Sequence, residues 1–310
     1  MSVEGTKTMS TLSKKKRRER YTAGEWAFII FCYIFVLLVI AVSLYPIIYV
    51  VSASLSSVAA VQRNQVVFLP VGFTTRAYEV VVKFPNIISS FLNSVFYSVV
   101  GTAMSLAFTI LAAYPLSKKQ LKGRRFFNLF IVFTMWFGGG MIPFYLLMKD
   151  LKLIDTRFGI LIYAVIGTFY IIILRSHFES LPDSLDESAK LEGANDLQVL
   201  LKIILPLSKP VLAALALYYA VGKWNSFFWE TLLLTNKAED KMPMQVILNR
   251  IVSASQFDEA AARQLSRGEQ ANPQTIKFAA IVLTSLPIVI IYPFLQKYFI
   301  HGTLAGAVKG

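Results

Sequence analysis

The sequence predicts an all-α polytopic membrane protein that crosses the bilayer six times. The chain of 310 residues is 55% hydrophobic and only 16% charged, with a mean hydropathy of +0.57. Soluble proteins average about 45–50% apolar and about 25% charged residues. The apolar residues are gathered into six long runs that contain few charges. Basic segments flank these runs, as in "KKKRRER" at 14–20 and "KKQLKGRR" at 118–125.

Each run approaches the roughly 20 apolar residues that a helix needs to cross a bilayer. We expect spans at 26–51, 87–116, 126–148, 158–174, 211–234 and 278–300. The first run is uncharged throughout. The second carries small residues that allow another helix to approach closely, namely Gly101, Ala103, Ser105 and Ala107.

The third and fifth runs are irregular. Gly138–Gly140, followed by Pro143, predicts a break or bend in the third span. Tight helix packing explains this glycine run, and so does irregular backbone beside a transport pathway. The fifth run contains Lys223 and Glu230, so hydropathy supports it least.

Basic residues orient the spans, because Lys and Arg are enriched in cytoplasmic loops. The N-terminus, loops 116–125 and 175–210, and the C-terminus hold 18 Lys and Arg, against 11 in the opposite loops. We therefore expect both termini to be cytoplasmic. The predicted organisation is a basic cytoplasmic N-terminus at 1–25 and a transmembrane domain at 26–310. A loop at 231–274 is expected on the extracytoplasmic side.

Composition also disfavours several other classes of protein. One cysteine, Cys32, excludes an internal disulfide, and two histidines leave little room for a histidine metal centre. The net charge of +13 is spread beside apolar runs and forms no separate basic domain, which argues against nucleic-acid binding. The first apolar run is too long for a cleavable signal peptide.

The segment "LDESAKLEGANDLQVLLKIILP" at 185–206 differs from the rest of the chain. Residues 179–196 contain six of the 18 acids. Ser184 and Glu187 have the spacing of a capping box, Gly193 predicts a bend, and Asn195 or Asp196 is placed to cap a second helix. That helix would carry Leu197, Leu200, Leu201 and Ile204 on one face and end or kink at Pro206. The pattern predicts a stiff cytoplasmic helix–glycine–helix elbow.

This elbow resembles the EAA loop of ABC importer permeases, whose pattern is E-A-A-x3-G-x9-I-x-L-P. The matching residues are Glu187, Ala189, Gly193, Ile203, Leu205 and Pro206. The chain departs from the family by Ser188 at the middle alanine and by Glu192 where many sugar permeases have aspartate. The C-terminal "YPFLQKYFIHGTLAGAVKG" is similar to the tail of MalG-like carbohydrate permeases. "FGGGMIPFYLLMKDLKLIDT" at 137–156 resembles the subgroup typified by LplC and YtcP, which is linked to oligosaccharides from complex polysaccharides.

The resemblance implies a type I ABC importer permease fold and a transmembrane permease subunit of an ATP-driven oligosaccharide importer in a bacterial cell membrane. It implies a second homologous permease, two ATP-binding subunits and an extracytoplasmic solute-binding protein as partners. The chain is then a non-catalytic subunit that binds no cofactor or metal, with ATP and Mg²⁺ on the ATPase chains. The sequence agrees on one point, since it contains no G-x-x-x-x-G-K-[ST] phosphate loop.

Three groups of residues follow from this resemblance. We expect the coupling loop at 183–206 to contact the ATPase through Glu187, Ser188, Ala189, Glu192, Gly193, Ala194, Ile203, Leu205 and Pro206. We expect the translocation path or substrate to meet Tyr218, Lys223, Trp224, Asn225, Trp229 and Gly139. We expect a tail formed by Val308, Lys309 and Gly310 to contact the ATPase dimer.

Simpler roles compete with these expectations. Glu187 would serve equally as a helix cap, and the leucines of the elbow would equally pack on the protein's own helices. Trp224 and Trp229 would equally form an interfacial aromatic belt, with Lys223 extending to the membrane surface. The amphipathic stretch within 231–274 would either lie on the membrane or contact the binding protein.

Rival functions lack their signatures. A membrane enzyme would need paired carboxylates or a histidine site within the spans, and these are nearly absent; the sequence has no H-E-x-x-H and no nucleophile elbow. A secondary transporter would carry ion-coupling carboxylates, yet Glu230 is the only acid near a midspan. An ABC permease for a non-sugar solute is the main alternative.

Overall fold

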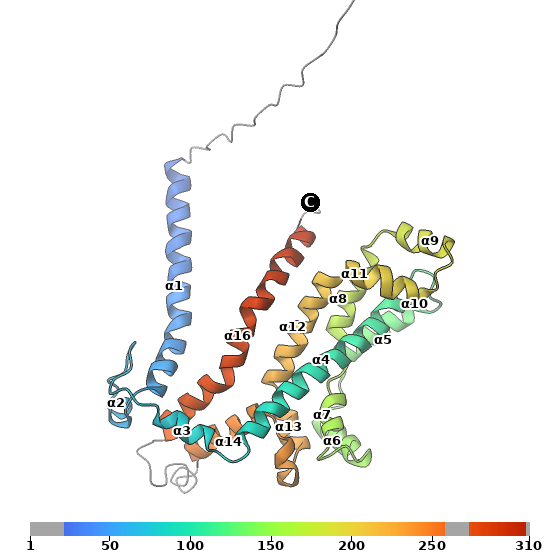
Figure 1. The fold of residues 1–310 in the computed structure, drawn as a ribbon. Coiled ribbons are helices and arrows are strands. Elements are labelled where there is room, and N and C mark those ends of the chain that lie inside the picture. Colours follow the sequence, from blue (N-terminus) through green and yellow to red (C-terminus); the bar gives the residue numbers. More distant parts are fainter. Residues whose placement is uncertain (1–21, 258–272, 308–310) are drawn as a thin grey trace, which may run out of the picture. The chain divides into compact units, whose positions relative to one another are not determined.

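The computed structural model describes residues 22–257 and 273–307, and every regular element within those ranges is a helix (Figure 1). The chain divides into two units, residues 1–48 and 49–310, which are described separately. In chain order the longer helices are α1 (Ala23–Ser54), α4 (Ile87–Ser117), α5 (Arg124–Trp136), α6 (Met141–Asp150), α8 (Thr168–Glu179), α9 (Asp183–Leu191), α12 (Lys209–Asn225), α14 (Met244–Phe257) and α16 (Pro273–Ala307). The short ones are α2 (Val58–Gln62), α3 (Arg76–Val82), α7 (Arg157–Ile162), α10 (Asp196–Val199), the π-helix η1 (Leu200–Ile204), α11 (Leu205–Leu207), α13 (Phe228–Leu233) and the 3₁₀-helix η2 (Asn236–Lys241).

Helix α1 contains the first predicted span. Its 32 residues carry no charge after Glu25, and at 1.5 Å per residue they extend about 48 Å. That length exceeds the roughly 30 Å of hydrocarbon in a bilayer. Side chains such as Phe28, Leu37 and Val42 are exposed, which suits a helix in contact with lipid.

Three helices in the described part are long and apolar enough to cross a membrane, at Ala23–Ser54, Ile87–Ser117 and Pro273–Pro293. Two further pairs of helices meet the same requirements of length and hydropathy when each bent pair is counted as one span. The chain bends by 109° between Arg124–Trp136 and Met141–Asp150. It bends by 82° between Asp196–Leu207 and Lys209–Asn225. The count is therefore three to five, and the predicted six is not confirmed.

The predicted fourth and fifth spans are not continuous helices. In the fourth, α7 ends at Ile162 and α8 begins at Thr168; in the fifth, α12 ends at Asn225 and α13 begins at Phe228. The break predicted at Gly138–Gly140 is confirmed, because α5 ends at Trp136 and α6 begins at Met141.

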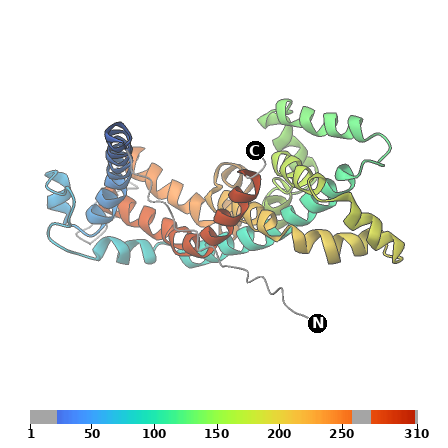
Figure 2. The same cartoon turned by 90° about the horizontal axis from the view of Figure 1, so that it is seen from above.

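Helix α4 is the central packing element of the second unit, with α12 and α8 against it (Figures 1 and 2). Small residues recur every three or four positions along its buried face, namely Ser90, Ser94, Ser98, Gly101, Thr102, Ser105 and Thr109. Small side chains let helix backbones approach closely inside a membrane. The stripe therefore explains why neighbouring helices pack on this one.

Two apolar clusters lie toward opposite ends of α4. One joins the start of α4 to α3, α7, α13, α14 and α16, and includes Val81, Leu233 and Ile276. The other joins the end of α4 to α8 and the 183–206 segment, and includes Leu174, Val199 and Leu200. The predicted elbow is thus anchored on a core of its own.

Candidate functional site

The 183–206 segment folds as the predicted helix–glycine–helix elbow. Helix α9 ends at Leu191, and Gly193 follows it with φ +85°, a left-handed conformation that glycine adopts without steric cost. The Ala194 N–H donates to the Ala189 carbonyl at 3.0 Å, which closes the bend.

Asn195 begins the second helix with a complete capping box. Its Oδ1 accepts from the Gln198 N–H at 2.9 Å, and its own N–H donates to Gln198 Oε1 at 3.0 Å. The prediction of a cap at Asn195 or Asp196 is confirmed, with Asn195 as the cap. Reciprocal bonds of this kind satisfy two helix-end donors and stiffen the bend.

The capping box predicted at Ser184 and Glu187 is wrong. Helix α9 begins at Asp183 after Pro182, which stands at the cap position and forms no side-chain cap bond. Ser184 therefore lies inside the first turn. Glu187 is exposed and makes no ion pair within residues 22–257 and 273–307.

After α10, the predicted leucine-rich helix changes geometry. Residues Leu200–Ile204 form a π-helix, and the chain bends by 82° between Leu207 and Lys209. The bend predicted at Pro206 is confirmed. The predicted single apolar face is divided, because Leu200 and Ile204 are buried whereas Leu197 and Leu201 are 60% and 55% exposed. One π turn shifts side chains around the helix, so the simple 3.6-residue spacing fails here.

Most acids of the elbow are neutralised by this chain's own bases. Lys119 pairs with Asp183 at 2.6 Å and Lys118 with Asp186 at 2.7 Å. Lys190 pairs with Asp186 at 3.3 Å and with Asp196 at 3.1 Å. Glu179 pairs with Arg124 and Arg175. Of the six acids at 179–196, only Glu187 and Glu192 have no basic partner in the part of the chain that the structure describes.

The ion pairs shift the pKa of two groups in opposite directions. Burial opposes ionisation of Asp186, but hydrogen bonds from Lys118 and Lys190 outweigh it and lower the pKa of this carboxyl. The hydrogen bond to Asp196 is the main cause that raises the pKa of Lys190, with Asp186 adding to it. Both groups are therefore held in their charged forms at neutral pH.

The predicted coupling residues fall into two sets. Ala189 is buried in the cluster at the end of α4, and Ala194, Ile203 and Leu205 pack against that cluster. Exposed residues form the outer surface of the elbow, namely Glu187, Ser188, Glu192, Gly193 and Pro206.

Leu191 was not among the predicted residues, yet it is 90% exposed. It follows Glu187 by four positions, which places both on one face of α9. That spacing was available in the sequence as a signal. Leu191, Leu197 and Leu201 give the elbow an exposed apolar component, and Leu191 lies on the same face as Glu187, which has no ion pair in the described residues.

Helix α12 carries most of the predicted path residues. Tyr218, Gly222 and Asn225 are all exposed, and their i, i+4, i+7 spacing places them on one face. A side chain at Gly222 would meet nothing within 4 Å. The Tyr218 ring stacks on Tyr170 at 6.0 Å between ring centroids. An aromatic face and a carboxamide thus border open space along this helix.

Lys223 lies on a different face of α12, and its side chain is directed toward α4 and the segment between α7 and α8. Its side chain crosses α4 at Gly101, where an added Cβ would lie 2.5 Å from Lys223 Cδ. Its ammonium donates to the Ala164 carbonyl at 3.2 Å. This carbonyl belongs to the break between α7 and α8.

The same break receives a second contact from α12. Tyr219 Oη accepts from the Gly167 N–H at 3.2 Å and lies 2.7 Å from Thr109 Oγ1. Buried backbone groups outside a helix need such partners. Lys223 and Tyr219 therefore stabilise the non-helical segment between α7 and α8.

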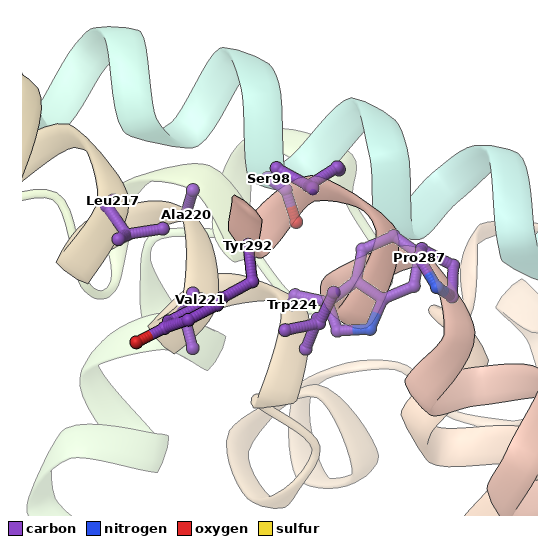
Figure 3. Close-up of a pocket in the computed structure, with 9 residues that line it drawn as sticks. Ser98, Leu217, Ala220, Val221, Trp224, Pro287 and Tyr292 are labelled. Atoms are coloured by element: carbon purple, nitrogen blue, oxygen red, sulfur yellow. The ribbon is translucent and has the colours of Figure 1, made fainter. Parts of the chain in front are cut away.

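Trp224 points into the protein. Its indole N–H donates to the Thr284 carbonyl at 3.1 Å, and its ring packs edge-on against Phe91 at 5.9 Å. Figure 3 shows Trp224 beside a small apolar cavity of about 80 Å³ that Ser98, Pro287 and Tyr292 also line. Trp224 thus joins α12 to α4 and α16.

Trp229 and Gly139 lie apart from these residues. Trp229 is on α13 and packs edge-on against Phe144 of α6 at 4.8 Å. Gly139 is exposed in the α5–α6 break, with nothing within 4 Å of an added Cβ. The structure therefore distributes the six predicted path residues over three places.

A buried polar group at the α12–α13 break was only partly anticipated. Glu230 is 4% exposed, and it accepts from Tyr163 at 2.7 Å and from Ser226 at 2.9 Å. The sequence marked Glu230 as an intramembrane acid but gave no sign of Tyr163, which lies 67 positions away.

Two predicted contact regions lie wholly or partly outside the residues that the structure describes. Val308, Lys309 and Gly310 lie outside the described residues, as does 258–272 of the predicted extracytoplasmic loop. The described part of that loop contains η2 and α14, which are fixed to the rest of the fold. Asn93 donates to the Asp240 and Met242 carbonyls at 2.6 and 3.2 Å, and Asp155 accepts from the Thr235 N–H at 2.6 Å.

Comparisons with known proteins agree on one family. Residues 26–304 match the family described as "Binding-protein-dependent transport system inner membrane component". The chain is 40% identical over 278 residues to the Polygalacturonan/rhamnogalacturonan transport system permease protein YtcP of Bacillus subtilis (strain 168), covering 90% of this chain and 96% of that one. It is 40% identical over 270 residues to Protein LplC of the same organism, covering 87% and 90%.

A solved structure shares both sequence and fold. It is titled "Crystal structure of a bacterial ABC transporter involved in the import of the acidic polysaccharide alginate". The alignment has a TM-score of 0.83 and 42% identity, and it covers 90% of this chain and 99% of that one.

Proposed function

Because this chain belongs to the family of binding-protein-dependent transport system inner membrane components, we infer that it is a membrane-embedded permease subunit of an ABC importer for oligosaccharides. The family and the sugar importers among its relatives support this function over a permease for a non-sugar solute. A cell-membrane location follows from the same family and from the membrane-spanning helices.

The finer proposal is that the elbow docks on an ATPase subunit. The observation that carries it is the contrast among the elbow's acids. Of the six acids at 179–196, four are paired internally, whereas Glu187 and Glu192 have no ion pair among the described residues. Glu187 also shares an exposed face with Leu191. An unpaired carboxylate beside exposed leucines suits a partner that offers a basic group and an apolar cleft.

The rest of the elbow supports force transmission. Ala189, Ile203 and Leu205 hold it on the core beside α4 and α8, and the capping box at Asn195 fixes its bend. ATP drives the spans only if the ATPase favours one arrangement of the elbow over another. A stiff elbow passes such a movement to α12, which follows it directly in the chain.

The complete importer would contain this chain, a second homologous permease, two ATP-binding subunits and an extracytoplasmic solute-binding protein. ATP and Mg²⁺ would then belong to the ATPase chains. We also propose that both termini are cytoplasmic and that the tail at Val308–Gly310 contacts the ATPase dimer.

The exposed α12 face with Tyr218, Gly222 and Asn225 is our proposed contribution to the sugar path. Sugar rings pack on aromatic faces, and their hydroxyls bond to carboxamides. Trp229 and Gly139 are proposed path residues at the α6–α13 end. For Lys223 and Trp224 the internal contacts described above favour a supporting role over direct sugar contact.

The substrate we propose is an oligosaccharide that carries carboxylates. The relative of known structure, at 42% identity, imports an acidic polysaccharide according to its title, and YtcP is named for polygalacturonan/rhamnogalacturonan transport. In reconstituted importer, oligosaccharides from alginate or polygalacturonan should stimulate ATP hydrolysis, and neutral maltooligosaccharides of equal length should not. Stimulation by both alike would remove the acidic specificity.

Native mass spectrometry of the complex, isolated through a tag on this chain, tests the assembly. We expect one copy of this chain, one homologous permease and two ATPase copies. Glu187→Arg should release ATPase while the second permease stays bound. Asp150→Arg, the same charge reversal at the end of α6, is the control and should retain all four chains. Isolation of a homodimer with no ATPase would contradict the proposal.

A further inference from the structure

A second charged site lies where α5 and α8 meet, apart from the elbow surface and the α12 face. Arg124, Arg125 and Arg175 line a hollow of about 540 Å³ together with Asn128, Leu129 and Val132. Small-molecule sites usually measure about 300–1,000 Å³. The hollow is therefore large enough for a ligand.

The charges of this hollow are not balanced. Glu179 pairs with Arg124 and, at 3.3 Å, with Arg175. Arg125 is exposed and forms no ion pair within the described ranges. Glu179 pairs with two of the three guanidinium groups, so the three arginines and this carboxylate together carry a net charge of two positive. Arginine forks bind phosphate and carboxylate oxygens in pairs, so the complementary ligand is an anion.

Buried polar atoms add a second requirement. Asn128 Oδ1 is buried and accepts no hydrogen bond among the residues that the structure describes, whereas Arg175 Nε has only its 3.3 Å ion pair with Glu179 Oε1 and no hydrogen bond. A bare phosphate offers acceptors for the arginine but no donor for Asn128. A headgroup that combines phosphate with a hydroxyl satisfies both atoms.

The surroundings identify the source of that headgroup. Arg125, Leu129, Val132 and Trp136 follow one face of α5 at i, i+4, i+7 and i+11. Leu129 is 62% exposed and Trp136 81% exposed. The charged hollow thus opens onto an apolar stripe along a membrane helix, which suits an acyl chain. A soluble anion has no apolar part that could contact this stripe, whereas a phospholipid does.

We propose that the hollow between α5 and α8 binds the headgroup of an anionic, hydroxyl-bearing phospholipid of the phosphatidylglycerol type, with an acyl chain along α5. Basic pockets between membrane helices hold anionic lipids in this way. The lipid connects Arg125 and Asn128 of α5 to Arg175 of α8. Since α8 leads directly into the elbow, the site lies next to the proposed coupling element.

Lipid retention by the intact importer tests this proposal. Native mass spectra of the tagged complex would be recorded with added phosphatidylglycerol, phosphatidylcholine or inorganic phosphate. We expect phosphatidylglycerol adducts to exceed phosphatidylcholine adducts and to resist millimolar phosphate. Arg125→Gln should lower phosphatidylglycerol retention about fivefold, the effect of one basic residue at a membrane surface.

Two further variants complete the test. Arg63→Gln removes one exposed charge after α2 and should retain lipid as the parent does. Asn128→Asp places a carboxylate in the hollow and should abolish selective retention. The four-chain mass in the same spectra reports whether each variant is folded. Equal retention of both lipids, displacement by inorganic phosphate, or equal loss in the Arg125 and Arg63 variants would overturn the proposal.

Discussion

Asp186 and Glu187 are adjacent carboxylates with different surroundings, and they should respond differently to mutation. Asp186 is paired with Lys118 and Lys190, whereas Glu187 is exposed and unpaired in the described residues. Asp186→Asn should lower the free energy of unfolding by about 1 kcal/mol, the usual net value of such bonds. Glu187→Gln should leave stability unchanged and reduce ATP-driven uptake. Thermal unfolding and transport in proteoliposomes separate the two effects, and a shared stability loss would contradict this assignment.

Gly159 and Gly139 differ in the space that their surroundings leave for a side chain, so the same change to alanine at each position tests the packing. A Cβ at Gly159 would lie 2.2 Å from the Leu153 carbonyl oxygen, a backbone atom that side-chain motion cannot relieve. A Cβ at Gly139 would meet nothing within 4 Å. Gly159→Ala should therefore destabilise the protein by about 1–3 kcal/mol, and Gly139→Ala should stay within about 0.5 kcal/mol of the parent. Thermal unfolding of the two variants measures the difference, and equal midpoints would show that the loop around Leu153 adapts.

The elbow should keep its stability from neutral to moderately alkaline pH and lose part of it in acid. The lowered pKa of Asp186 means that its stabilisation is complete above the usual carboxyl pKa of about 4 and is lost as pH falls through the lowered value. The raised pKa of Lys190 means that its contribution holds up to the usual value of about 10.4 and is lost only above it. Hydrogen exchange of amides 183–196, corrected for intrinsic rates, should show constant protection from pH 6 to 9 and a loss below about pH 4. Asp186→Asn should remove much of that acid step; an unchanged step would assign it to other groups.

Local signals were sufficient for some elements and insufficient for others. The bend at Gly193, the cap at Asn195 and the break at Gly138–Gly140 were all predictable, because each depends on the residues at that position. The cap at Ser184 was wrong because Pro182 starts α9 earlier. The break between α7 and α8 had no local signal, since Lys223 and Tyr219 satisfy its backbone from a distant helix.

For the whole molecule, the sequence indicated which loops share a side but not how they join. The basic segment at 118–125 was interpreted as flanking the membrane, and the sequence did not indicate that its Lys118, Lys119 and Arg124 also pair with acids at 179–186. Such pairings depend on the tertiary fold and leave no periodic pattern. The elbow that carries the proposed coupling residues was predictable because its motif is continuous. The predicted path residues have no continuous motif, and they are spread over α12, α13 and the α5–α6 break.

These joined loops lead to a prediction about the orientation of the entire chain. Ion pairs hold 118–125 and 179–196 together, and the contacts of Asp155 and Asn93 hold the 149–157 and 231–257 segments together. Each group must then lie on one side of the membrane. The higher count of basic residues assigns the first group to the cytoplasm. With Cys32 replaced by serine, single cysteines at Lys122 or Glu192 should react with an impermeant maleimide only in inverted vesicles.

The opposite face supplies the control for that experiment. Single cysteines at Arg63 or Lys237, both exposed, should react only in right-side-out vesicles. If all four positions label with the opposite sidedness, the fold stands and the inferred orientation is reversed, which would place the elbow where no ATPase can reach it. If the Lys122 and Glu192 positions label from different sides, the ion pairs between their loops do not form in the membrane. The labelling pattern therefore tests the orientation and the charge network that anchors the elbow in one set of variants.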